Sequence, residues 1–184
     1  TAVVVGAGFI GMEMAEVLTQ CGVKTTMIEA APQVMGWWLD NEMAPIIHKY
    51  LKKKGVDLIL NDKVISLEGS AKVEKAVLGS GKEVPAELVI FGTGVKPEVW
   101  LAKDAGLALG TTGGIHVDEY LRTSDEFIYA VGAAIEVKTP ITDNYALMFL
   151  AGPANRQGRL CADNIAGRPS KYTGSQGTAI IKIM

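Results

Sequence analysis

The first part of the chain contains two short apolar segments, residues 2–5 and 25–28, with a longer segment between them. Short apolar runs that are bounded by turn residues are typical of buried strands. The first run leads directly into a glycine-rich turn, and the segment after that turn predicts a helix. The pattern therefore predicts a strand, a helix and a second, parallel strand that ends on Glu29.

An amphipathic helix is predicted next, over residues 40–54, with Asp40 or Asn41 as its N-cap. A lysine run precedes Gly55, which suits the negative end of the helix dipole and a glycine stop. We interpret this run as a solvated helix end rather than as a nucleic-acid patch. Residues 56–60 predict a third buried strand.

Short alternating segments separated by Gly-Ser turns then predict a three-stranded β-meander, with strands over residues 63–67, 73–78 and 83–84. Residues 87–91 predict a further buried strand of the parallel sheet. The fold class is therefore α/β, a Rossmann-like parallel sheet with an inserted meander. Ordinary dehydrogenases lack this insertion, whereas the nucleotide domains of two-dinucleotide flavoproteins are built this way.

The second half of the chain predicts part of a second nucleotide-binding domain. Its predicted elements are an extended segment over residues 116–121, a strand over 127–131, a polar loop over 136–144, a helix over 150–165 and a final strand over 177–184. Pro153 falls in the first turns of that helix, where proline is tolerated.

The first turn carries the main chemical signal, because Gly6-Ala7-Gly8-Phe9-Ile10-Gly11 matches the pattern G-x-G-x-x-G between a strand and a helix. In this pattern the first glycine allows the tight turn, the second lets a pyrophosphate approach the backbone, and the third lets the helix pack on the sheet. The free amides at the helix N-terminus then bind the phosphates. We expect Gly6, Gly8, Phe9, Ile10 and Gly11 to bind a dinucleotide.

Glu29 stands at the tip of the second strand, where an acid accepts hydrogen bonds from both ribose hydroxyls. A carboxylate there would repel a 2′-phosphate, so the sequence favours NAD over NADP. The alternative is that the glycine turn is only structural and that Glu29 is solvated.

Composition excludes several classes of function. A net charge of −2 gives no electrostatic reason to expect nucleic acid or an anionic membrane as a partner, and no apolar run is long enough to span a membrane. The two cysteines, Cys21 and Cys161, are far apart and are expected to be buried, in a reducing, cytoplasmic setting. His48 is expected at a helix boundary and His116 in an extended segment, neither with partners for metal or acid–base chemistry.

Four motifs in order resemble the FAD- and NAD(P)-dependent pyridine nucleotide-disulfide oxidoreductases, most closely the branch of coenzyme A-disulfide reductases, NADH oxidases and NADH peroxidases. They are residues 6–13, 92–97, 123–132 and 150–159. The resemblance implies that residues 1–114 bind NAD(H) and that residues 115–184 are the C-terminal portion of an FAD-binding domain. It also implies an N-terminal FAD segment with the redox cysteine and a dimerisation domain outside this sequence, and a homodimeric parent protein.

Individual roles follow from the resemblance only. Glu13 matches an acidic residue near the flavin and is the candidate catalytic residue, although an exposed Glu in the first helical turn is an equal alternative. Phe9 matches an aromatic gate that covers the nicotinamide pocket until NADH displaces it, with plain packing as the alternative. Trp37 and Trp38 are expected to anchor a loop rather than to face a substrate channel.

Other matched positions bind cofactor in the family. Gly92 and Gly94 match the loop beside the nicotinamide, and Leu150 and Ala151 match a helix N-terminus that points at the flavin. Gly132 and Ala133 stand where the family has Gly-Asp, whose carboxylate binds the FAD ribityl chain. The resemblance therefore makes six further residues candidates for cofactor binding: Gly92, Gly94, Gly132, Ala133, Leu150 and Ala151. Because Ala133 cannot accept a hydrogen bond, we expect FAD binding by this chain to be weak or absent.

The resulting expectation is the nucleotide-binding portion of an enzyme that passes hydride from NADH through FAD to a disulfide, a peroxide or oxygen, with no metal. One alternative is a flavin-dependent reductase of a ferredoxin, a rubredoxin or a nitrite-reducing partner. The other is a non-catalytic NADH-binding module.

Overall fold

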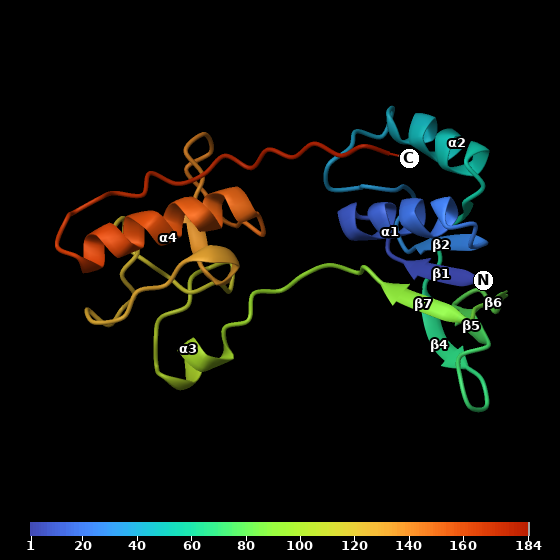
Figure 1. Cartoon of the computed structure of the whole chain (residues 1–184), viewed down its shortest axis with the longest axis horizontal. Coiled ribbons are helices and arrows are strands. Elements are labelled where there is room, and N and C mark those ends of the chain that lie inside the picture. Colours follow the sequence, from blue (N-terminus) through green and yellow to red (C-terminus); the bar gives the residue numbers. More distant parts are fainter. Residues whose placement is uncertain (184) are drawn as a thin grey trace. The chain divides into compact units, whose positions relative to one another are not determined.

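The structure is a computed structural model of the chain, and it describes residues 1–183 (Figure 1). The chain forms two compact units. The first consists of residues 1–94 and the C-terminal residues from Ile180, and the second is Val95–Ala179. The assignment of residues 1–114 to NAD(H) and of residues 115–184 to FAD concerns ligands, so it stays a prediction.

A parallel sheet in the order β3-β2-β1-β7 forms the centre of the first unit. In this order its strands are β3 (Asp57–Leu60), β2 (Thr25–Glu29), β1 (Ala2–Val5) and β7 (Leu88–Phe91). The register places Val4 of β1 beside Met27 on one side and Ile90 on the other. The predicted parallel sheet and the α/β class are confirmed.

The two faces of the sheet are covered differently, because successive residues of a strand point to opposite faces. Val4 packs in a core with α1 (Phe9–Gln20), which contributes Met12 and Ala15. Val3 and Val5 pack in a second core with the meander. The meander consists of β4 (Val64–Glu68), β5 (Lys75–Leu78) and β6 (Glu83–Pro85) in antiparallel order, as predicted.

Residues 88–91 form a strand, β7, but the prediction that this strand is buried is wrong. β7 is an edge strand, and Leu88 and Phe91 are 44% and 56% exposed. An apolar run indicates a strand but does not tell its place in the sheet. β3 is the other edge and is half-buried, with Leu58 in the core.

Helix α2 (Ala44–Lys53) begins later than predicted. Its N-cap is Met43, not Asp40 or Asn41. The carbonyl of Asp40 instead accepts the N–H groups of Met43 and Ala44, so residues 40–43 form a turn before the helix. Lysines do occupy the last turn of the helix, as expected.

The second unit contains α3 (Trp100–Asp104), a 3₁₀ turn (Gly132–Ala134), β8 (Glu136–Lys138), β9 (Tyr145–Leu147) and α4 (Ala151–Ile165). The predicted α4 is confirmed, with Leu150 as its N-cap. The predicted polar loop over residues 136–144 is wrong where β8 pairs with β9. A buried core of this unit includes Leu121, Ile135 and Cys161.

One further strand prediction in this unit is wrong. Residues 127–131 make a single bridge, between Tyr129 and Arg122, instead of a strand. The local cause is Asp125, whose carboxylate and carbonyl accept the N–H groups of Phe127 and Ile128. Such local bonds compete with the ladder that a strand requires.

The predicted C-terminal strand is also wrong for residues 177–183, and Met184 lies outside the described residues. Ile181 and Ile183 instead pack on the core of the first unit as an extended segment. Cys21 is exposed at the C-terminal end of α1, so its expected burial is wrong, whereas Cys161 is buried. No helix in the described part of the chain is long and apolar enough to cross a membrane.

Leu51 attaches α2 to the sheet, and its replacement tests the packing of the first unit. Its side chain is fully buried in the core with Met27 and Val56. We expect Leu51→Ala to lower the free energy of unfolding by about 2–5 kcal/mol, because it removes buried methyl groups and leaves a cavity. Urea unfolding followed by circular dichroism measures this change. Ile46→Ala on the same helix is the control, since Ile46 is 62% exposed, and an equal loss for both variants would contradict the packing described.

Candidate nucleotide-binding site

The glycine turn after β1 is packed too tightly for side chains at two of its positions. Gly6 has φ +96°, and a Cβ there would lie 2.5 Å from the carbonyl oxygen of Gly92. A Cβ on Gly11 would lie 1.9 Å from the carbonyl oxygen of Gly6. These two glycines therefore let β1, α1 and the end of β7 approach one another.

Gly8 is different, because a Cβ built on it meets no atom within 4 Å. Its backbone is extended, with φ −79°, so the fold itself accepts a side chain here. Gly8 is also the N-cap of α1, where no side chain among the described residues caps the free amides and no acid lies in the first turn. This combination of free amides, helix dipole and open space fits a pyrophosphate.

Glu29 lies against the same turn. Its Oε2 accepts the N–H of Ala7 at 2.7 Å, and its Oε1 accepts the N–H of Ala31 at 2.8 Å. Each carboxylate oxygen has a second lone pair, so the group can still accept hydrogen bonds from a ribose. The alternative that Glu29 is merely solvated is wrong, since the side chain is half-buried and bonded to the turn. The residues of the first unit thus fit an NAD-type dinucleotide.

The segment after β2 is fastened to the turn as well. The N–H of Met35 donates to the carbonyl of Ala7 at 2.9 Å, and Met35 is buried with φ +55°, a conformation that side chains rarely adopt. Trp37 and Trp38 follow and are 98% and 61% exposed. The expected loop anchor is therefore wrong for Trp37. Trp38, in contrast, packs edge-on against the ring of Phe9, with ring centroids 5.3 Å apart.

Other predicted residues lie around the turn. Gly92 donates its N–H to Val5, and a Cβ on it would lie 3.1 Å from the nitrogen of Gly11. Gly94 has φ +115° with open space where a Cβ would stand. Ile10 is exposed, at 47%.

Glu13 is exposed on α1 and makes no hydrogen bond or ion pair with the described residues. It lies beyond the first turn of the helix, which contains no acid, so the alternative of a first-turn Glu is wrong.

In the second unit, Gln157 is a residue whose role the sequence did not reveal. It is 1% exposed, its Oε1 accepts the N–H of Gly132 at 2.7 Å, and its Nε2 donates to the hydroxyl of Tyr172 at 3.0 Å. Gly132 has φ +84°. Burial of a side-chain amide with both ends bonded is the signal, and it appears only in three dimensions.

The flavin-related positions fit FAD only in part. The N-terminus of α4 has no side-chain cap among the described residues, so the amides near Leu150 and Ala151 suit an electron-rich ring. Ala133, however, is exposed in the 3₁₀ turn and presents a methyl group where the family has a carboxylate. The side chain at this position cannot accept a hydrogen bond from a hydroxyl.

A buried carboxylate forms the strongest polar cluster of the second unit. Glu136 is 3% exposed and accepts hydrogen bonds from Thr112 and from Nδ1 of His116, the latter at 3.0 Å. The expectation that His116 has no ionisable partner is therefore wrong. Burial raises the pKa of Glu136, but the hydrogen bonds from His116 and Thr112 outweigh it and leave the pKa below its ordinary value.

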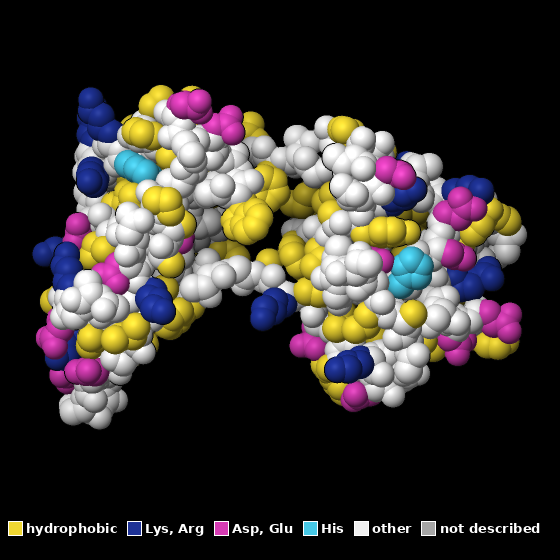
Figure 2. Space-filling view, turned by 180° about the vertical axis from the view of Figure 1, so that it is seen from behind, with side chains coloured by type: hydrophobic (Ala, Val, Ile, Leu, Met, Phe, Trp, Pro, Cys, Tyr) yellow, Lys and Arg dark blue, Asp and Glu magenta, His cyan; other side chains and the backbone are white. Residues whose placement is uncertain are grey.

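Other side chains give no competing site. Nε2 of His48 accepts the N–H of Val34 at 3.2 Å, and burial followed by the charge of Lys52 lowers the pKa of His48. No three His, Cys, Asp or Glu side chains of residues 1–183 gather as a metal site requires. On the face drawn in Figure 2, basic and acidic side chains are interspersed, in keeping with the net charge of −2.

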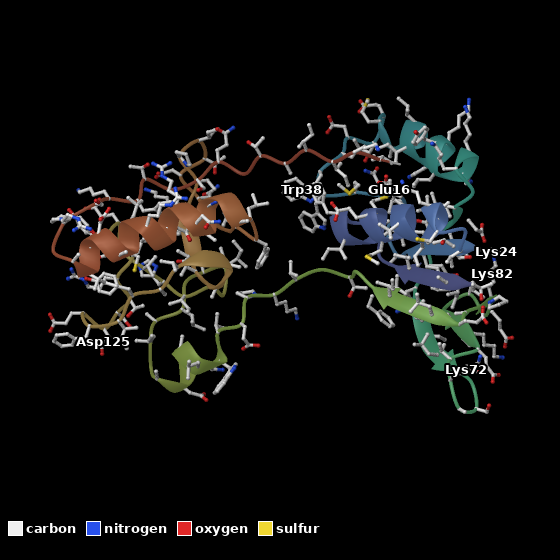
Figure 3. All side chains as sticks on the ribbon, viewed as in Figure 1. Glu16, Lys24, Trp38, Lys72, Lys82 and Asp125 are labelled. Atoms are coloured by element: carbon white, nitrogen blue, oxygen red, sulfur yellow. The ribbon has the colours of Figure 1, made fainter. Side chains whose placement is uncertain are left out.

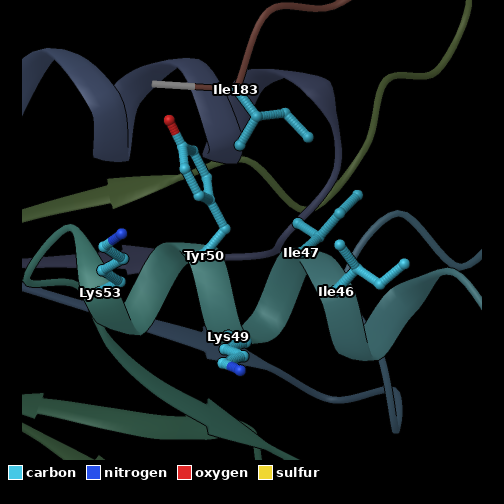
Figure 4. Close-up of a pocket in the computed structure, with 6 residues that line it drawn as sticks. All are labelled: Ile46, Ile47, Lys49, Tyr50, Lys53 and Ile183. Carbon is cyan, nitrogen blue, oxygen red and sulfur yellow. The ribbon is translucent and has the colours of Figure 1, made fainter.

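A shallow apolar groove lies along α2 (Figure 4). It is lined by Ile46, Ile47, Lys49, Tyr50, Lys53 and Ile183. The groove contains no glycine turn, and its lining is mostly apolar, so it lacks the glycine-rich phosphate loop of the first site.

Comparison with known proteins gives a consistent result. A family model described as pyridine nucleotide-disulphide oxidoreductase matches residues 1–158. An NAD(P)H sulfur oxidoreductase (CoA-dependent) of Pyrococcus abyssi is 39% identical over 99% of this chain and 40% of its own length. An NADH oxidase of Methanocaldococcus jannaschii is 42% identical over 98% of this chain and 40% of its own length.

Solved structures agree with these relatives. Reduced CoADR-RHD of Bacillus anthracis superimposes with a TM-score of 0.92 and 45% identity, over 99% of this chain and 32% of that one. An NAD-dependent persulfide reductase of A. fulgidus has a TM-score of 0.93 and 42% identity, over 100% of this chain and 34% of that one. The chain thus spans about 40% of the length of the curated relatives that it matches.

Replacing Glu136 tests its role in the second unit. The pKa of Glu136 is lowered in the folded chain, so its carboxylate stabilises the fold above the unfolded pKa of about 4.5. This stabilisation is lost as the pH falls through the folded pKa. We expect Glu136→Gln to be less stable at neutral pH and to lose less stability than the wild type below pH ~4.5. Urea unfolding from pH ~3 to 7 measures this. Glu126→Gln, at an exposed position, is the control, and parallel pH profiles of E136Q and wild type would contradict the assignment.

Proposed function

Because the chain belongs to the pyridine nucleotide-disulphide oxidoreductase family, we propose that it is the nucleotide-binding portion of an NADH-dependent flavoenzyme. The whole enzyme passes hydride from NADH through FAD to a disulfide, a peroxide or oxygen. FAD, when bound, supplies the redox chemistry, and this chain binds and orients the nucleotide.

The observation that carries the proposal is the open space at Gly8 above the uncapped N-terminus of α1. The pyrophosphate of NADH binds to these amides, and the adenosine ribose binds to Glu29. The turn is already held by Ala7, which donates to Glu29 and accepts from Met35, so binding requires little rearrangement of the backbone. The carboxylate of Glu29 disfavours a 2′-phosphate, which selects NADH.

The nicotinamide half lies toward the end of β7, next to β1 in the sheet. In this proposal Gly92 and Gly94 leave room for the ring and Ile10 borders it. The ring of Phe9 covers the pocket until NADH displaces it. Glu13 is a candidate catalytic residue near the flavin of the whole enzyme, and the family resemblance supports this role.

The second unit contributes part of the flavin site. The amides at Leu150 and Ala151 face the flavin ring, where the dipole of α4 stabilises negative charge on it. Gly132 and Ala133 approach the ribityl chain without a carboxylate. FAD binding by this chain is therefore weak or absent.

Ala133 favours one alternative, a module that binds NADH without turnover. A reductase that passes electrons to a ferredoxin, a rubredoxin or a nitrite-reducing partner is the other alternative. A redox cysteine near the flavin, in the N-terminal segment of the whole protein, would favour the main proposal over it. We further propose a cytoplasmic, homodimeric enzyme with no nucleic-acid or membrane partner. The family resemblance supports the homodimer.

Gly8→Ala tests the proposed site without disturbing the fold. The added Cβ meets no protein atom, and the poorer N-cap offsets the entropy gained in the unfolded chain, so the free energy of unfolding changes by less than about 1 kcal/mol. It would occupy the position of the pyrophosphate, and we expect NADH to bind more weakly by a factor of about 10 or more, because an extra carbon against a packed group costs about 1–3 kcal/mol. Isothermal titration with NADH measures the affinity.

Gly158→Ala on α4 is the matched control, since its Cβ also meets open space. Equal NADH affinity of the G8A variant and the wild type, with both chains folded, would refute the phosphate site at the glycine turn.

Ala133→Asp tests the flavin-related part. An Asp there supplies a charged hydrogen-bond acceptor, which is worth about 1.5–3 kcal/mol, or a factor of about 10 to 100 in FAD affinity. We expect the wild-type chain to purify without flavin and the A133D variant to bind FAD more tightly. Flavin fluorescence during titration with FAD measures both. A stoichiometrically yellow wild-type preparation would contradict the expectation, and Ala134→Asp controls for the added charge.

A further inference from the structure

Trp38 is an exposed aromatic residue whose backbone is attached to the proposed site. The N–H of Trp38 donates to the carbonyl of Met35 at 2.8 Å, and Met35 in turn donates to Ala7 in the glycine turn. The side chain of Gln33 closes the same segment by donating to the carbonyl of Leu39 at 2.8 Å. Residues 33–39 are thus attached to the turn that binds the pyrophosphate in our proposal. Figure 3 shows Trp38 at one end of α1.

The indole of Trp38 contacts one other aromatic ring, that of Phe9. The ring centroids are 5.3 Å apart and the planes are inclined at 71°, the edge-to-face arrangement that aromatic pairs prefer. Phe9 directly follows Gly8 and is half-buried on the core of the first unit. Trp38 itself is 61% exposed, so little besides this contact holds its side chain.

Trp37 offers a built-in comparison. It is adjacent in sequence, it is 98% exposed, and it makes no ring contact within residues 1–183. The two tryptophans therefore differ in one respect that matters here, the contact with Phe9.

We propose that the contact with Trp38 stabilises the Phe9 ring in the position that it has in this structure, and so sets the affinity of the nicotinamide half of NADH. The inference rests on the proposed function, in which Phe9 covers the nicotinamide pocket. Moving Phe9 aside breaks the contact with Trp38. The free energy needed to break this contact weakens the binding of any ligand that displaces the Phe9 ring. A ligand without nicotinamide leaves the ring in place, so its binding is not weakened.

The test compares NADH with ADP-ribose, which has the ribose and pyrophosphate but no nicotinamide. Trp38→Ala should bind NADH more tightly by a factor of about 2 to 10, the worth of an aromatic pair of this geometry. Its affinity for ADP-ribose should match that of the wild type. Trp38→Phe keeps an aromatic edge against Phe9 and should bind NADH as the wild type does, and so should Trp37→Ala. Isothermal titration of the full chain gives all the affinities.

A double-mutant cycle with Phe9→Ala completes the experiment. Without the Phe9 ring, Trp38→Ala should have no further effect on NADH binding. Unchanged or weaker NADH binding by W38A, an equal shift for ADP-ribose, or an effect of W38A that persists in the F9A background would each overturn the role of Trp38. A wild-type chain that binds neither ligand would refute the proposed function itself, whereas normal ADP-ribose binding with no NADH effect would refute the Trp38 inference alone.

Discussion

The close approach of three backbone segments at the glycine turn is the constraint on which the site depends. β1, the start of α1 and the end of β7 meet where Gly6 and Gly11 have no room for a Cβ. This contact aims the N-terminus of α1 at the carboxyl edge of the sheet. Of the three glycines in the turn, Gly8 alone is left without neighbours on its side-chain side. The same tight packing therefore creates both the rigidity of the turn and the opening that a phosphate group fits.

The proposed preference for NADH over NADPH depends on Glu29, which is bonded to the same turn. Its bonds to Ala7 and Ala31 hold the carboxylate in place before any nucleotide arrives. A charged acceptor that is already fixed loses little conformational freedom on binding, and its like charge disfavours a phosphate at the 2′ position. In the proposed function one carboxylate therefore serves both the fold and the recognition of the ribose, through different lone pairs.

The sequence predicted most of the first unit because its signals are local. The glycine pattern, the buried β1 and β2 and the turns of the meander depend on neighbours in the chain. Predictions failed where tertiary contacts decide: β7 lies at a sheet edge, the residues before Met184 pack without pairing, and Asp125 uses the backbone donors of a predicted strand. The contacts of Trp38 and Glu136 join residues far apart in sequence, so no spacing rule reveals them.

Gly132 shows that shape and chemistry at one turn are separable. The turn keeps its positive φ because glycine allows it, and the buried Gln157 satisfies its N–H from α4. Tyr172 then satisfies the other end of that amide. None of these bonds involves the side chain of Ala133, so a methyl group there costs the fold nothing while it removes an acceptor for a ligand. The bonds that hold this turn therefore do not depend on which side chain stands at position 133, so a substitution there can change what the turn offers a ligand without changing its backbone.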